Sequence, residues 1–223
     1  MPSEYALWQY LHILLFAYWL GADLGVYLAA RYVARPELAL AERLRFLELL
    51  LQIDMGPRTG LILMVPVGAT LAAKSALAPV AAGWLPAIWV ASLAWLALAW
   101  FLFLWPRHAL AGPLALLDRG VRIAVVVLFV ATGASTLLGA GPLAAGWLGA
   151  KFVLYGLVVV AGLLLRGTLR DWAAGFELLR EPATVAAGNA RITQAWLQAR
   201  RYAHALWLAV ALIALLGVTK PAV

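Results

Sequence analysis

The chain has 223 residues, of which 65% are hydrophobic and 12% are charged, and it contains no cysteine. Soluble domains carry about 25% charged residues, so this composition excludes an ordinary soluble fold and predicts helices that cross a membrane. The absence of cysteine excludes a disulfide, a thiolate metal site and covalent haem attachment. Any chemistry must come from His, carboxylate, Lys or Arg side chains.

Six apolar stretches follow one another along the chain. They cover residues 5–32, 48–73, 84–105, 120–141, 147–166 and 202–218. Each is about as long as an α-helix that crosses the hydrocarbon core, and helices satisfy their own backbone hydrogen bonds there. The sequence therefore predicts a single all-α domain over residues 1–223, a polytopic membrane bundle of about six transmembrane helices.

Two arginine-rich connectors interrupt the apolar stretches. The first runs from Arg31 to about Glu48, and the second runs from Arg166 to Arg201. Both place apolar residues at helical spacing with charged residues between them, which is typical of amphipathic helices at a membrane surface. We therefore expect two surface helices on one face of the membrane.

The distribution of basic residues predicts the orientation. All arginines fall on the face of the two connectors, whereas the other face has only Lys74, Lys151 and Lys220. By the positive-inside rule, both termini are then periplasmic or extracellular. The net charge of +7 reflects this topology and attraction to anionic lipid, which argues against nucleic-acid binding. The N-terminus has no basic region and the first stretch is too long for a signal peptide, so we expect no cleavage.

His12 is the first candidate site residue. It lies about 8–10 Å below the outer end of the first stretch, with Trp8, Phe16 and Trp19 at helical spacing around it. A neutral imidazole among flat aromatic rings is suited to ligate the iron of a non-covalent haem. The alternative is a histidine that bonds to a carbonyl group of a neighbouring helix.

Lys151 is the second candidate, because it lies at a similar depth, about 6 Å below the same surface. It could be a second axial ligand, a partner of a haem propionate or a binder of another anion. A lysine that snorkels to the headgroups is the alternative. His204 lies about 15 Å from His12 in depth, so it is expected to be an interfacial anchor or part of a second site.

A second polar group, formed by Asp23, Arg58 and Arg122, is expected in the inner leaflet. Asp23 follows His12 by eleven residues, or three helical turns, so both project from nearly the same face. A pair between Asp23 and either arginine would be an ordinary structural ion pair. The alternative is a proton route, or a headgroup site for a quinone or for porphyrin carboxylates.

A copper pathway would need soft or imidazole ligands. The chain offers three histidines at scattered depths, and only Met55 and Met64 besides the initiator. The ligand supply for copper is therefore poor.

Several segments resemble one superfamily of membrane proteins. The segment LHILLFAYWLGADLGVYL resembles the opening helix shared by HemJ-type protoporphyrinogen oxidases and CopD-type copper-resistance proteins. The segments RIAVVVLFVATGAST and WLGAKFVLYGLVV resemble the Arg–Thr-Gly helix of that superfamily and the Trp-x-x-x-Lys helix that follows it. The segment MGPRTGLILMVPVG is a weaker match to the HemJ segment around its membrane proline.

The resemblance implies a bacterial inner-membrane protein that binds haem b, with His12 matching the first-span histidine and Lys151 the later lysine. It implies a redox protein that is either protoporphyrinogen oxidase-like or linked to quinone, with quinone or porphyrin as partner. The chain departs from HemJ proteins in having six predicted spans rather than four. A copper or solute transporter, and a cofactor-free subunit that anchors or assembles a membrane complex or homo-oligomer, are the alternatives.

Overall fold

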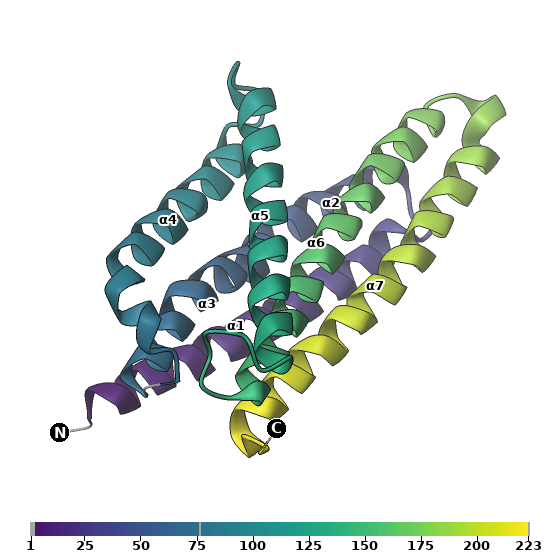
Figure 1. The fold of residues 1–223 in the computed structure, drawn as a ribbon. Helices are drawn as coiled ribbons and strands as arrows, with labels where there is room; N and C mark the ends of the chain where they lie inside the picture. The colour runs from purple at the N-terminus through teal and green to yellow at the C-terminus, as the bar shows by residue number, and fades with distance from the viewer. Residues whose placement is uncertain (1–2, 76, 223) are drawn as a thin grey trace.

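The computed structural model describes residues 3–75 and 77–222, and every regular element within them is helical. The elements are α1 (Glu4–Val33), α2 (Leu40–Ile53), α3 (Met55–Lys74), α4 (Pro79–Leu104), α5 (Ala111–Leu137), α6 (Gly146–Leu178), the short 3-10 helix η1 (Pro182–Thr184) and α7 (Val185–Thr219). The predicted all-α helical bundle is therefore confirmed (Figure 1).

The helices have the character of membrane-spanning segments. Four of them are long and apolar enough to cross a membrane: α1, the part of α4 from Ala82 to Leu104, α6, and α7 together with η1. The outward faces carry large apolar side chains, such as Leu128, which is 62% exposed. Exposed apolar surface on this scale marks an interaction surface, and on helices of this kind it indicates a membrane protein that contacts the lipid bilayer.

The six long helices form two layers of three (Figure 1). In one layer α3 packs between α1 and α4, and in the other α6 packs between α5 and α7. Both chain termini lie at the same end of the bundle, which we call the terminal end, and we call the opposite end the arginine-rich end. Lys74 at the end of α3 pairs with Glu4 at the start of α1 across 2.7 Å, so these two helices are antiparallel.

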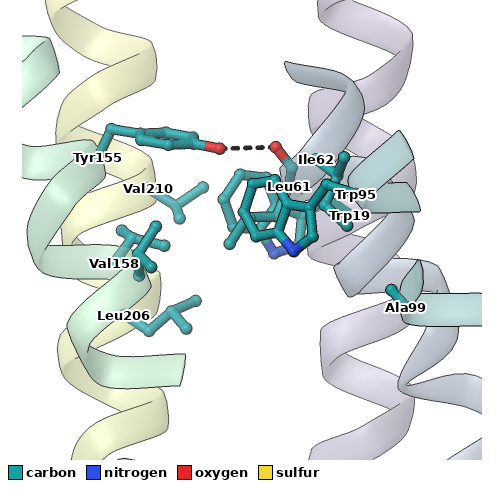
Figure 2. Packing of buried hydrophobic residues seen from close by; sticks show 10 residues of the cluster. Trp19, Leu61, Ile62, Trp95, Ala99, Tyr155, Val158, Leu206 and Val210 are labelled. Carbon is teal, nitrogen blue, oxygen red and sulfur yellow. Dashed lines mark hydrogen bonds between the residues drawn. The ribbon is translucent and has the colours of Figure 1, made fainter. Parts of the chain in front are cut away.

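Large side chains join the two layers near the middle of the bundle (Figure 2). Trp19 of α1, Ile62 of α3 and Trp95 of α4 face Tyr155 and Val158 of α6, and all five are buried. The Tyr155 hydroxyl donates a 2.7 Å hydrogen bond to the Leu61 carbonyl oxygen of α3. This bond satisfies a buried polar group and fixes one layer against the other.

Helices α5 and α6 approach each other at glycines. A Cβ atom on Gly133 would lie 2.5 Å from the carbonyl oxygen of Gly149 and 2.8 Å from Val153 Cγ2. Small residues permit this close approach between membrane helices. The absence of a side chain at Gly133 therefore determines how α5 packs on α6.

We expect Gly133→Ala to destabilise the protein by about 1–3 kcal/mol, because the new methyl group forces α5 away from α6. The measurement is the free energy of unfolding in detergent micelles. Gly120→Ala on the same helix is the matched control, since a Cβ atom there meets nothing within 4 Å. Equal stability of the two variants would show that the close approach at Gly133 does not matter.

The second connector differs from the surface helix expected over residues 166–201. Helix α6 continues to Leu178 and α7 begins at Val185, so this segment forms a helical hairpin that extends the bundle. The two helices have 33 and 35 residues, which gives each a length of about 50 Å, well beyond a core of about 30 Å. The turn comes at Pro182, the first proline after α6 begins, because proline cannot continue a helix.

The first connector does contain a separate helix, α2, but the second apolar stretch begins later than expected. Helix α3 starts at Met55, directly after Asp54, rather than at residue 48. Pro57 accounts for this boundary, because proline is tolerated in the first turn of a helix and disrupts its interior. The residues from 48 to 53 belong to α2 instead.

Arg43 of α2 ties the connector to the bundle. Its side chain is 2% exposed, and its Nε donates to the Val33 carbonyl oxygen at 2.8 Å while Nη1 donates to Asn189 Oδ1 at 2.7 Å. The guanidinium carbon lies 5.4 Å from the Phe176 ring centroid. Burial lowers the pKa of Arg43, and the Glu37 charge raises it. The end of α1, α2 and the α6–α7 hairpin are thereby joined at the arginine-rich end.

Candidate functional site

His12 lies on α1 against α3, towards the terminal end of the bundle. A Cβ atom on Gly68 of α3 would lie 3.4 Å from His12 Cε1, so the ring packs on a position without a side chain. Its Nδ1 atom is buried and has no hydrogen-bond partner among residues 3–75 and 77–222. Nδ1 therefore does not donate to a carbonyl group of a neighbouring helix, which was the alternative expected for this residue.

Lys151 approaches His12 from the other layer. Its Nζ lies 5.7 Å from the Trp147 ring centroid, and a Cβ atom on Gly217 of α7 would come within 2.8 Å of it. His12 therefore lies beside α3, whereas Lys151 lies beside α7. Lys220 adds a second positive charge nearby.

The aromatic residues predicted around His12 divide into two places. The Trp8 ring packs on Trp89 of α4 with centroids 5.9 Å apart, and the Trp89 Nε1 donates to Thr70 Oγ1 at 3.1 Å. Trp19 belongs to the buried core of the bundle, and Phe16 packs against that core. Trp8 therefore lies on the terminal side of His12, and Phe16 and Trp19 lie on its inner side.

The predicted pairs between Asp23 and the arginines do not form in the described part of the chain. Arg58 forms a salt bridge with Asp54, and Arg122 forms one with Asp118 at 3.0 Å. In each pair the carboxylate lies four residues before the arginine on the chain, where the two side chains meet on one helical face. Such local pairs form without any particular register between helices. Arg58 and Arg122 are therefore paired with Asp54 and Asp118 instead of with Asp23.

Asp23 itself is half-buried on α1 without an arginine partner among the described residues. The side chains of Trp19 and Trp207 lie beside its carboxyl group, and Asp54 is the charged group that acts on it. Asp54 and Asp118 belong to ion pairs, whereas Asp23 belongs to none among the described residues.

Asp118 is the polar residue that the sequence analysis missed. Its side chain is fully buried and accepts two hydrogen bonds, from Arg122 Nε at 3.0 Å and from Trp95 Nε1 at 2.9 Å. Arg166 Nη1 forms a salt bridge with the same carboxylate at 2.8 Å. The predicted span began at residue 120 and left Asp118 in a loop, whereas α5 begins at Ala111. The four-residue spacing between Asp118 and Arg122 was the available signal.

His204 lies outside the region of His12 and Lys151. It precedes Gly217 on α7 by thirteen residues, which is about 20 Å along the helix. Its exposed ring packs near Tyr27 and Trp207, with centroids 5.6 and 5.7 Å away. This environment suits the predicted interfacial anchor. Where the structure describes the chain, no group of three or more His, Asp or Glu residues could hold a metal ion.

Comparison with protein-family models, with curated proteins and with solved structures finds no match for this chain.

Proposed function

We propose that the protein is a haem b-binding membrane redox protein with His12 as an iron ligand. The observation that carries the proposal is the buried Nδ1 of His12, which has no hydrogen-bond partner among the described residues. A buried polar atom without a partner is costly, and a neutral imidazole nitrogen is a common ligand of haem iron. This unpartnered nitrogen is what supports haem as the cofactor.

The residues around His12 have distinct roles in this proposal. Haem, when bound, supplies one-electron chemistry. His12 holds the iron, and Lys151 is either the second ligand or the partner of a propionate group. Trp8 covers the terminal side of the site, while Phe16 and Trp19 close it towards the core and keep water away.

The inner polar group of Asp23, Arg58 and Arg122 transfers protons or binds an acidic substrate. Arg58 and Arg122 each have another carboxylate partner. Asp23 is thereby left without an arginine partner, and it is the residue that carries the proton. A quinone or a porphyrin is the proposed redox partner, as in quinone-linked electron transfer or a protoporphyrinogen oxidase-like reaction. The proposed location is a bacterial inner membrane with both termini periplasmic, because the arginines gather at the opposite end.

The test is a reduced-minus-oxidised optical spectrum of the detergent-purified protein, together with pyridine haemochrome quantification. We expect sharp b-type bands and about one haem per chain. A protein that stays colourless after haem is supplied during expression would contradict the proposal. That result would favour a copper or solute transporter, or a cofactor-free subunit of a membrane complex.

A further inference from the structure

The cluster around Asp118 holds more positive charge than its own carboxylate balances. Arg122 and Arg166 both bind Asp118, so two guanidinium groups share one carboxylate and leave a charge of +1. The other Asp118 oxygen accepts from Trp95. One carboxylate therefore faces two guanidinium groups, and the cluster keeps one surplus positive charge.

Arg122 has an unused donor inside this cluster. Its side chain is 4% exposed, and its Nη2 is buried without a hydrogen-bond partner in the described residues. The guanidinium carbon lies 5.5 Å from the Trp95 ring centroid. A buried guanidinium with an unsatisfied donor is costly in an apolar medium. An additional hydrogen-bond acceptor at Arg122 Nη2 would therefore be stabilising.

Neighbouring acidic groups do not supply that acceptor. Asp54 is already paired with Arg58, whose charge also reaches Arg166. Asp23 has Trp19, Trp207 and Asp54 as its polar neighbours and bonds to neither arginine of the cluster. The surplus positive charge therefore remains at Arg122 and Arg166.

We propose that Arg122 and Arg166 form a binding site for one anionic group, a phosphate or a carboxylate. Guanidinium groups bind both through short, charge-assisted hydrogen bonds. Arg166 is 29% exposed and marks the side from which the anion enters, while Arg122 forms the buried end. Asp118 is a positioning residue that holds both guanidinium groups in place.

The depth of the site favours an anion at the membrane surface. Arg166 lies twenty residues beyond Gly146, where α6 begins, which is about 30 Å along the helix and equals the thickness of a hydrocarbon core. The arginine-rich surface therefore lies at the level of Arg166. The phosphate of an anionic lipid and a free phosphate ion both have the required chemistry. This inference gives the proposed acidic-ligand role its residues, and it does not depend on haem.

The experiment measures lipid binding to the full chain by native mass spectrometry after delipidation, with phosphatidylglycerol and phosphatidylcholine as probes. We expect the wild-type protein to bind phosphatidylglycerol at least ~10-fold more tightly than phosphatidylcholine. Arg166→Gln should abolish this preference, because it leaves a neutral Asp118–Arg122 pair. Arg191→Gln is the matched control, since that arginine forms an exposed pair with Asp171, and it should bind as the wild type does.

Competition with inorganic phosphate identifies the source of the anion. Displacement of phosphatidylglycerol by millimolar phosphate would support a site that also takes the free ion, and an absence of competition would support a lipid site. Equal binding of the two lipids by the wild-type protein, or full preference in Arg166→Gln, would overturn the inference. His12→Ala should keep the preference, so failure of the haem proposal and failure of the anion site can be told apart.

Discussion

His12→Ala is expected to lower the haem content at least ~10-fold, from about one haem per chain, while the protein still inserts and folds. The loss follows because no other described histidine lies near Lys151, and His204 is about 20 Å away along α7. Folding should be little affected, since His12 Nδ1 forms no hydrogen bond whose loss would leave a partner unsatisfied. Pyridine haemochrome absorbance per chain, measured on the monodisperse fraction from size exclusion, reports the result.

Two variants separate ligand loss from general disruption. Asp23→Asn lies on the same helix, three turns further in, and should keep its haem. His204→Ala removes the exposed histidine of α7 and should also keep it. A His12→Ala protein with its full haem complement would mean that the ligand assignment is wrong, and equal losses in all three variants would point to a damaged bundle.

The boundaries of α1 could be predicted closely from the sequence, whereas the course of α6 could not. The predicted stretch 5–32 and the observed helix Glu4–Val33 differ by one residue at each end. There the apolar run and the helix share their limits, and the Ser3 side chain caps the N-terminus by accepting from the Ala6 N–H. At Arg166 the hydropathy falls while the helix continues to Leu178, since charge limits membrane depth and not helix formation.

The same distinction applies to the two polar regions. The depths of His12 and Lys151 follow from counting residues along each helix. In the structure His12 lies beside Gly68 of α3 and Lys151 beside Gly217 of α7. The partners of Arg58 and Arg122 depend on helix rotation and on local competitors, which hydropathy does not report. Arg58 pairs with Asp54 and Arg122 pairs with Asp118, each four residues earlier on the chain, and neither pairs with Asp23.

Asp118→Ala is expected to be the most destabilising single substitution in the polar cluster, at about 3–5 kcal/mol. It would leave the buried Arg122 guanidinium and the Arg166 guanidinium without a carboxylate, and an unpaired charge in an apolar interior is costly. The Trp95 indole would lose its acceptor as well. Unfolding in detergent micelles, followed by near-UV circular dichroism, measures the loss.

Asp171→Ala is the matched control, because Asp171 pairs with Arg191 in the hairpin where both side chains are more than 40% exposed. It should cost less than about 1 kcal/mol. Adding Arg122→Leu to Asp118→Ala should then recover part of the lost stability, because the most deeply buried unpaired charge is removed. If the double variant were less stable than Asp118→Ala alone, Arg122 would stabilise the bundle through its packing on Trp95 rather than through its charge.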